Sequence, residues 1–320
     1  MIGAIGEGLF EVGIDANDAL SPLRRGYGGD AANALVMAAR MGASTRLCSR
    51  VGDDAAGREL RGFWAAEGLD LAYVRVDSGA ATGVYINEQT PAGHRFRYYR
   101  RASAGSRLGV EDLDGGFLAG LRALHLTGIS LSISASAAEA AEAAARQARS
   151  AGTMISFSVN YRSALDPDDE RLLGAARTAD VLFISVEEAK ALLAIDAAGS
   201  IHAALGRSGE TIVTDGSWGA TVVSAPGILQ LPAIAVEVVD AAGAGDALAG
   251  AYLAMRLRGC SSEDSLRSGI AAASLSCMRH GAAASYPERA EVETARERQE
   301  TAISRQGAST RWSRRVASRP

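Results

Sequence analysis

The sequence VVDAAGAGDALAG at residues 238–250 decides the fold, because a turn of small residues joins an apolar approach to a helical pattern. A loop that opens directly into a helix leaves backbone N–H groups without intrahelical partners, and the helix dipole adds partial positive charge there. Gly243 and Gly245 allow an anion to approach this backbone closely. The stretch therefore predicts an anion site at the start of a helix.

Asp246 is the unusual residue of this stretch, because a carboxylate repels the phosphate that such a turn would bind. Its position makes chemical sense if it takes a proton from a nucleophile that attacks the phosphate. The alternative is that Asp246 only stabilises the N-terminus of a helix, which is a common use of an acidic residue. The residues of this stretch leave both interpretations open.

Length, charge and cysteine content exclude several classes of protein. A chain of 320 residues can bury a large core, as one α/β domain or two. The net charge of −4 gives no reason to expect nucleic acid or a membrane as a partner. Three scattered cysteines without metal-ligand spacing fit a reducing compartment. No signal peptide and no run of about 18 apolar residues is found, so we expect a cytoplasmic protein.

Short apolar runs alternate with helical patterns along most of the chain, which predicts an α/β fold with a mainly parallel sheet flanked by helices. Residues 73–101 differ, because their alternating pattern predicts a small antiparallel sheet. The period of two places Phe96, Tyr98 and Arg100 on one face. A phenol beside a guanidinium suits a carboxylate substrate, whereas the alternative is an exposed strand with solvated arginines.

Two further junctions carry polar residues. Asp30 and Asn33 lie one turn apart where Gly28-Gly29 leads into a helix, so they either cap that helix or bind neighbouring hydroxyl groups. Arg162 follows a strand at 153–159, and open α/β sheets bind ligands at such carboxyl ends. Arg162 is therefore a second candidate anion ligand. No Gly-x-Gly-x-x-Gly follows the first strand, which argues against an NAD-linked oxidoreductase.

Three motifs in this order resemble those of the PfkB or ribokinase-like carbohydrate kinases: Gly28–Asn33, Gly52–Gly57 and Asp240–Asp246. The resemblance covers about residues 2–287. It implies a ribokinase-like, Rossmann-like domain over residues 1–287, with a small antiparallel β-sheet lid inserted at about 10–15 and 73–101. The Glu/Arg-rich and Ser/Arg-rich residues 288–320 are predicted to be a disordered charged tail.

The resemblance also implies roles for residues in phosphoryl transfer. Asp246 would deprotonate the terminal hydroxyl of the sugar, and the N–H groups from Ala242 through Gly243, Ala244 and Gly245 would stabilise the transferring phosphoryl group. The family uses ATP with Mg²⁺, and a monovalent cation such as K⁺ is a further expectation. The implied nucleotide-binding residues are Ser185, Thr214, Gly216, Gly219, Gly243 and Gly245. Glu188 would have an indirect role toward the metal.

Within the family, the segments 83–85, 96–100, 126–130 and 159–162 resemble the 2-dehydro-3-deoxygluconokinases, which phosphorylate a sugar acid. This closer resemblance implies that Tyr85, Tyr98, Arg100 and Arg162 surround the carboxylate and keto end of the substrate. Gly29, Asp30 and Asn33 would bind its hydroxyl groups. A planar Arg fork pairs well with a carboxylate.

Some alternatives and departures stay open at this stage. A kinase for fructose or another neutral sugar is the nearest alternative, and a non-catalytic sugar or nucleotide sensor is a different class. The sequence has Ser185 and Ala241 where the family pattern has Asn and Thr, and an uncommon acid at Asp215. The oligomeric state is also open, and lid-to-lid pairing through the exposed face of the small sheet is the route to a homo-oligomer that the sequence offers.

Overall fold

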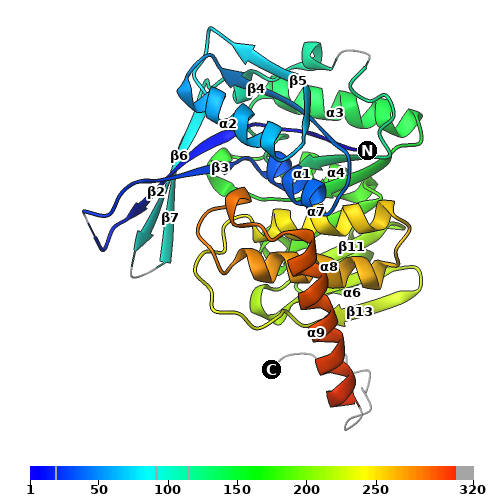
Figure 1. Ribbon diagram of the computed structural model, residues 1–320. Coiled ribbons are helices and arrows are strands. Elements are labelled where there is room, and N and C mark those ends of the chain that lie inside the picture. Colours follow the sequence, from blue (N-terminus) through cyan, green and yellow to red (C-terminus); the bar gives the residue numbers. More distant parts are fainter. Residues whose placement is uncertain (19, 91–92, 114–115, 308–320) are drawn as a thin grey trace.

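The computed structural model describes residues 1–18, 20–90, 93–113 and 116–307 (Figure 1). Its larger sheet has nine strands among these residues, in the order β13-β12-β11-β10-β9-β8-β1-β4-β5. The bounds of these strands are β1 Ile2–Ile5, β4 Thr45–Gly52, β5 Asp70–Asp77, β8 Ala123–Thr127, β9 Met154–Ser158, β10 Val181–Ser185, β11 Glu210–Thr214, β12 Ala220–Ser224 and β13 Gly227–Leu231.

The sheet is parallel from β5 to β11, and β12 and β13 extend it in antiparallel pairs. β1 lies inside it, with Ile2 opposite Thr45 of β4 and Ala123 of β8. All four residues of β1 are buried, as expected of a parallel strand that is covered on both faces. The predicted fold class is confirmed.

Helices cover both faces of the large sheet, and each face has its own apolar core. The helices are α1 Asp30–Arg40, α2 Ala55–Ala66, α3 Ala135–Ser150, α4 Asp169–Thr178, α5 Val186–Leu193, α6 Ala198–Ala204, α7 Ala244–Leu257, α8 Ser262–Ser276 and α9 Arg289–Gly307. One core contains buried residues of α1, α2, α7 and α8, and the other those of α3 to α6. Successive residues of β10 divide between them: Phe183 packs edge-to-face on Tyr252 of α7, while Leu182 and Ile184 join the opposite core.

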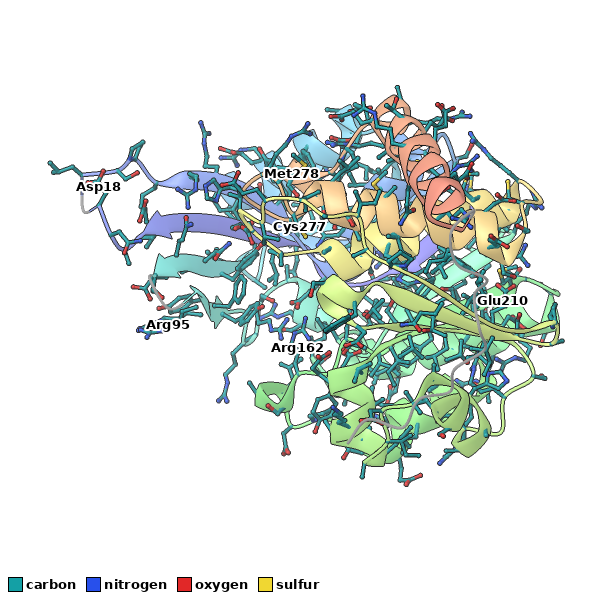
Figure 2. All side chains as sticks on the ribbon, turned by 90° about the horizontal axis from the view of Figure 1, so that it is seen from below. Asp18, Arg95, Arg162, Glu210, Cys277 and Met278 are labelled. Atoms are coloured by element: carbon teal, nitrogen blue, oxygen red, sulfur yellow. The ribbon has the colours of Figure 1, made fainter. Side chains whose placement is uncertain are left out.

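A second sheet projects from the body as a lid, in the order β3-β2-β6-β7 (Figure 1). Its strands are β2 Leu9–Asp15, β3 Arg24–Gly28, β6 Gly83–Thr90 and β7 Gly93–Tyr99. The predicted lid is present, but it is not wholly antiparallel, because β2 pairs with β6 in parallel. Figure 2 shows Asp18 at the far tip of the lid and Arg162 where the lid meets the body.

The prediction that residues 73–76 belong to the lid is wrong. They lie in β5, which is parallel to β4 at the edge of the large sheet, with Val74 opposite Ser49. β5 follows α2, so it completes a strand-helix-strand unit whose two strands share one sheet. Apolar and polar residues alternate along an edge strand with one exposed face in the same way as along a lid strand, so the sequence pattern could not distinguish the two.

The prediction of a disordered tail is also corrected over residues 289–307, which form α9. Val292 is fully buried in the core that contains α8, so the helix begins with an apolar anchor. Glu/Arg pairs four residues apart support its exposed faces, at 2.6 Å between Arg289 and Glu293 and 3.5 Å between Arg296 and Glu300. Residues 308–320, which the same prediction covered, lie outside the described chain.

The contact between α1 and α7 depends on Gly250 and can be tested by substitution. A Cβ atom there would lie 2.2 Å from the carbonyl oxygen of Ala34 and 2.9 Å from the Cβ of Met37. We expect Gly250→Ala to lower the free energy of unfolding by about 1–3 kcal/mol, because the two helices must move apart. Urea unfolding measures the change.

Gly62 in α2 provides the matched control. A Cβ atom there would meet nothing within 4 Å. Gly62→Ala should therefore raise the free energy of unfolding by up to about 1 kcal/mol, since alanine favours the helix. Equal effects of the two substitutions would contradict the proposed close approach of α1 and α7.

Candidate active site

A cavity of about 440 Å³ lies between the lid and the carboxyl ends of the parallel strands. The helix-start turn at residues 240–246 forms one wall, and lid residues such as Phe96 form another. The cavity brings together residues predicted from distant parts of the sequence: Gly29, Asp30, Asn33, Tyr85, Tyr98, Arg100, Arg162, Gly243, Ala244, Gly245 and Asp246.

The turn before α7 has the geometry of an anion site. Gly243 precedes the helix in the left-handed conformation, at a φ of 75°. Within the described ranges, the N–H groups of Gly243, Gly245 and Asp246 donate to no protein acceptor. Such unpaired donors at a helix N-terminus suit a phosphate group.

The prediction that every N–H group from Ala242 to Gly245 is available needs correction. The N–H of Ala242 donates to Asp240 Oδ1 at 2.9 Å, and that of Ala244 donates to the carbonyl of Ala241 at 3.3 Å. The turn uses these two bonds to hold its own shape. The donors free to meet an anion are therefore those of Gly243, Gly245 and the helix start.

Asp246 lies in the first turn of α7, where two amide side chains hold its carboxylate. Asn33 Nδ2 donates to Oδ2 at 2.9 Å, and Asn160 Nδ2 donates to Oδ1 at 3.3 Å. Asn160 also donates to Asp30 Oδ2 at 3.2 Å, so two carboxylates share one amide. Three segments that lie far apart in the sequence thus meet at Asp246.

The surroundings of Asp246 favour its protonated form. Burial, and next the negative charge of Asp30, raise the pKa of Asp246 from its ordinary 3.8 to about 7. The hydrogen bonds from Asn33 and Asn160 and the charge of Arg162 act in the opposite direction. A carboxyl group with a pKa near neutrality is well suited to accept and release a proton.

Asp30 reaches the cavity because the preceding glycine adopts an unusual backbone conformation. Gly29 has a φ of 113°, and a Cβ atom there would lie 2.3 Å from the carbonyl oxygen of Glu7. Gly29, not Asp30, occupies the N-cap position of α1. Asp30 Oδ1 accepts the N–H of Ala31 at 2.8 Å, and Oδ2 accepts the amide of Asn160 at 3.2 Å. Asp30 is therefore not the N-cap residue, but it pairs with an N–H group of the first turn and also faces the cavity.

Arg100 is engaged by a residue that the sequence analysis missed. Its guanidinium forms an ion pair with the buried carboxylate of Glu7 and lies 4.7 Å from the centre of the Tyr98 ring. Burial raises the pKa of Glu7 to about 7, against the lowering effect of Arg100. Arg100 therefore brings to the cavity a positive charge that Glu7 already offsets.

Arg162 has a different environment. It is exposed, and its guanidinium donates to the carbonyl of Tyr161 at 2.9 Å. It forms no ion pair with any residue in the described part of the chain. The pKa of Tyr98 is raised by burial, and the charge of Arg162 is the leading effect that opposes this shift. Arg162 and the Tyr98 phenol thus face the same space.

Ser185 and Glu188, predicted to serve the nucleotide and metal, line neither this cavity nor the second one described below. They form a capping box at the start of α5, in which Ser185 Oγ accepts from the N–H of Glu188 at 3.1 Å. Glu188 Oε1 also accepts the N–H of Tyr161 at 2.8 Å. Glu188 thereby supports the segment that carries Asn160, whose φ of 40° is unusual for a residue with a side chain.

A second cavity of about 150 Å³ adjoins the anion turn on its other side, where it shares Ala244 and Gly245 with the first. Thr214, Gly216 and Gly219, all predicted to bind the nucleotide, line it. Its remaining wall is mainly apolar and consists of Ala233, Leu248, Ile270, Ala273 and Ser274. An apolar slot that ends at an anion site fits a planar base with attached phosphates.

Three polar side chains that line the cavity were not among the predicted site residues: Glu7, Asn160 and Asp240. Glu7 and Asn160 each follow the carboxyl end of a parallel strand, which is the signal that identified Arg162. A search for polar residues after the carboxyl end of every predicted strand would have found both Glu7 and Asn160. Asp240 belongs to one of the three recognised motifs, but nothing in the sequence predicted its hydrogen bond with Asn87 of the lid.

Fold and site together are those of a ribokinase-like phosphotransferase. A profile described as pfkB family carbohydrate kinase matches residues 13–289. A 2-dehydro-3-deoxygluconokinase of Thermoproteus tenax is 34% identical over 77% of this chain and 78% of its own length. A fructokinase of Klebsiella pneumoniae is 35% identical over 71% and 76%.

A solved Escherichia coli protein in complex with ATP and Mg²⁺ has a TM-score of 0.84 and 25% identity, over 93% of this chain and 99% of its own. The chain belongs to the pfkB family of carbohydrate kinases. It is a phosphotransferase that uses an alcohol group as acceptor. None of the helices in the described ranges is long and apolar enough to span a membrane.

The raised pKa of Asp246 predicts a gain in stability when its charge is removed. A folded-state pKa of about 7, above the ordinary 3.8, means that ionisation costs stability as pH rises between these two values. Asp246→Asn keeps an oxygen for Asn33 and avoids this cost. We expect its Tm to exceed that of the wild type by about 2–4 °C at pH 8 and by less at pH 5.

Thermal unfolding of both proteins at the two pH values measures this difference. Comparing them at each pH removes the contribution of Glu7, which is present in both. A variant that is less stable than the wild type at pH 8 would contradict the environment described for Asp246.

Proposed function

We propose that this carbohydrate kinase transfers the γ-phosphoryl group of ATP to the terminal hydroxyl of a sugar acid. The best candidate is 2-dehydro-3-deoxy-D-gluconate, with its 6-phosphate as the product. The observation that carries the sugar-acid assignment is Arg162, an exposed guanidinium at the cavity without an ion pair among the described residues. The Thermoproteus tenax relative, named for this substrate, supports the assignment.

In the proposed reaction, Asp246 accepts the proton of the terminal hydroxyl while its oxygen attacks the γ-phosphorus. A new P–O bond forms as the bond from phosphorus to the bridging oxygen of ADP breaks. The free N–H groups of Gly243 and Gly245 stabilise the charge on the transferring group. Asn33 and Asn160 keep the carboxylate of Asp246 aimed at one point of the cavity.

The proposed nucleotide site is the second cavity, where Thr214, Gly216 and Gly219 would hold ATP with its phosphates toward Gly245. Mg²⁺ supplies charge neutralisation on these phosphates when bound. The described residues contain no group of three or more His, Cys, Asp or Glu that could hold a metal, so the metal would enter mainly on the nucleotide. Dependence on K⁺ and assembly into a homo-oligomer stay predictions.

A second candidate is a kinase of a neutral sugar such as fructose. The Glu7–Arg100 ion pair favours it, because one of the two cavity arginines is already neutralised. The fructokinase relative also fits. A non-catalytic sensor explains the site less well, since binding alone does not need a carboxyl group with a pKa near 7 beside an anion turn.

ADP release with a panel of acceptors separates these candidates. The panel contains 2-dehydro-3-deoxygluconate, its galactonate-derived epimer, fructose and ribose. We expect the sugar acids to give a kcat/KM about ten- to a hundredfold above the neutral sugars, the range that one charge-assisted hydrogen bond provides. Faster turnover of fructose would overturn the sugar-acid proposal, and turnover of none would favour the sensor.

Arg162→Ala tests the residue on which the assignment rests. It should raise KM for the sugar acid by roughly ten- to a hundredfold and change KM for fructose by no more than about twofold. Arg97→Ala is the control, because Arg97 is an exposed arginine of β7 that does not line the cavity. An equal rise of KM for both substrates in Arg162→Ala would indicate a neutral-sugar kinase.

A further inference from the structure

A buried amide joins the lid to the anion turn. Asn87 belongs to β6 of the lid and is 4% exposed. Its Nδ2 atom lies 2.8 Å from Glu11 Oε1, on the neighbouring strand β2, and 3.3 Å from Asp240 Oδ2, in the segment that enters the anion turn. An amide nitrogen has two hydrogens, so both bonds can form at once.

The lid end of this connection reaches the substrate cavity. Tyr85 lines that cavity and donates its hydroxyl to Glu11 Oε2 at 2.6 Å. Glu11 therefore accepts from Tyr85 with one oxygen and from Asn87 with the other. A single carboxylate thus links Tyr85, which lines the cavity, to Asn87.

The other end of the connection fixes the backbone of the turn. Asp240 Oδ1 accepts the N–H of Ala242 at 2.9 Å, and Oδ2 accepts the N–H of Gly281 at 3.0 Å. The bond to Ala242 sets the conformation in which the next residue, Gly243, presents its free N–H. Asp240 thus holds the backbone of the turn directly before the first free donor of the anion site.

Burial makes this chain of bonds stiff. Tyr85, Glu11, Asn87 and Asp240 are each 5% exposed or less, so water is a poor substitute for any of the partners. A rotation that moved the Asn87 amide away from Glu11 would take the donor from the buried Oε1 atom, whereas Asp240 Oδ2 would keep the N–H of Gly281.

We propose that Asn87 is a positioning residue for phosphoryl transfer, which ties the lid to Asp240 and sets the anion turn when the lid engages a sugar. This inference rests on the proposed function, because it takes the cavity as the sugar site and the turn as the phosphate site. Its consequence is energetic coupling: bound sugar should tighten the binding of the nucleotide, and the reverse. Asn87 itself lines neither of the two cavities.

The test measures the affinity of Mg²⁺ with a non-hydrolysable ATP analogue, with and without a saturating sugar that the wild type phosphorylates. We expect the sugar to tighten the binding of the analogue by about fivefold or more in the wild type. In Asn87→Ala this factor should fall to about one, with each ligand's separate affinity within about twofold of the wild type and with a lower kcat.

Gln89→Ala is the matched control, because Gln89 lies two residues further along β6 on the same face and its side chain accepts from Arg24 at 3.4 Å, away from Asp240. It should keep the coupling factor of the wild type. Asn87→Gln retains the amide and should recover part of the coupling that Asn87→Ala loses. This recovery separates a specific role from a loss of packing.

Three results would overturn the inference: no coupling in the wild type, unchanged coupling in Asn87→Ala, or parallel losses of both separate affinities and of Tm in that variant. A failure of the sugar-acid proposal is distinguishable, because it is seen in the acceptor panel with the wild type. The coupling is then measured with fructose or whichever sugar is turned over.

Discussion

The site depends on the hydrogen bonds that two amide side chains donate to the Asp246 carboxylate at the start of α7. Asn33 comes from α1 and Asn160 from the segment after β9, so the carboxylate has its place only when all three segments are packed. The neighbouring Asp30 adds negative charge, and together with burial this moves the pKa of Asp246 into the neutral range. The folded protein thus disfavours the ionised form of Asp246 more than water does.

The fold makes this arrangement possible by bringing small residues to the points of closest approach. Gly250 lets α7 lie against the backbone of α1, and Gly29 lets the chain turn sharply over Glu7 before α1 begins. The parallel strands end at the same edge, where Asn160 and Arg162 follow β9. The lid then covers this edge, and its buried amide Asn87 meets Asp240.

The sequence was informative wherever a local pattern had a single geometric meaning. The small-residue turn before Asp246 predicted a helix start, and the period of two correctly placed Phe96, Tyr98 and Arg100 toward one cavity. It was misleading where two structures share a pattern, as for residues 73–76, which alternate in an edge strand much as they would in a lid. The charged composition of residues 289–307 likewise concealed the one buried valine that anchors α9.

Contacts between distant segments could not be read from the sequence. Arg100 is a residue type that often binds carboxylates, but in the structure it forms an ion pair with Glu7, some 90 residues earlier in the chain. The hydrogen bond between Asp240 and Asn87 could not be predicted either, because Asn87 lies on the lid, far from Asp240 in the sequence. The free donors of the anion turn also follow from such bonds, since Asp240 and Ala241 occupy the N–H groups of Ala242 and Ala244.

The most direct test of the account is the pH dependence of kcat/KM for the best acceptor. If Asp246 is the base, kcat/KM should fall about tenfold per pH unit below about 7 and level off above it, because only the ionised carboxylate accepts a proton. The same break should persist in Glu7→Gln, which removes the other carboxyl group of the cavity with a pKa near 7. Two results would contradict the assignment of Asp246 as the base: a kcat/KM that stays constant from pH 8 to below 6, or a break in the pH profile that is absent in Glu7→Gln.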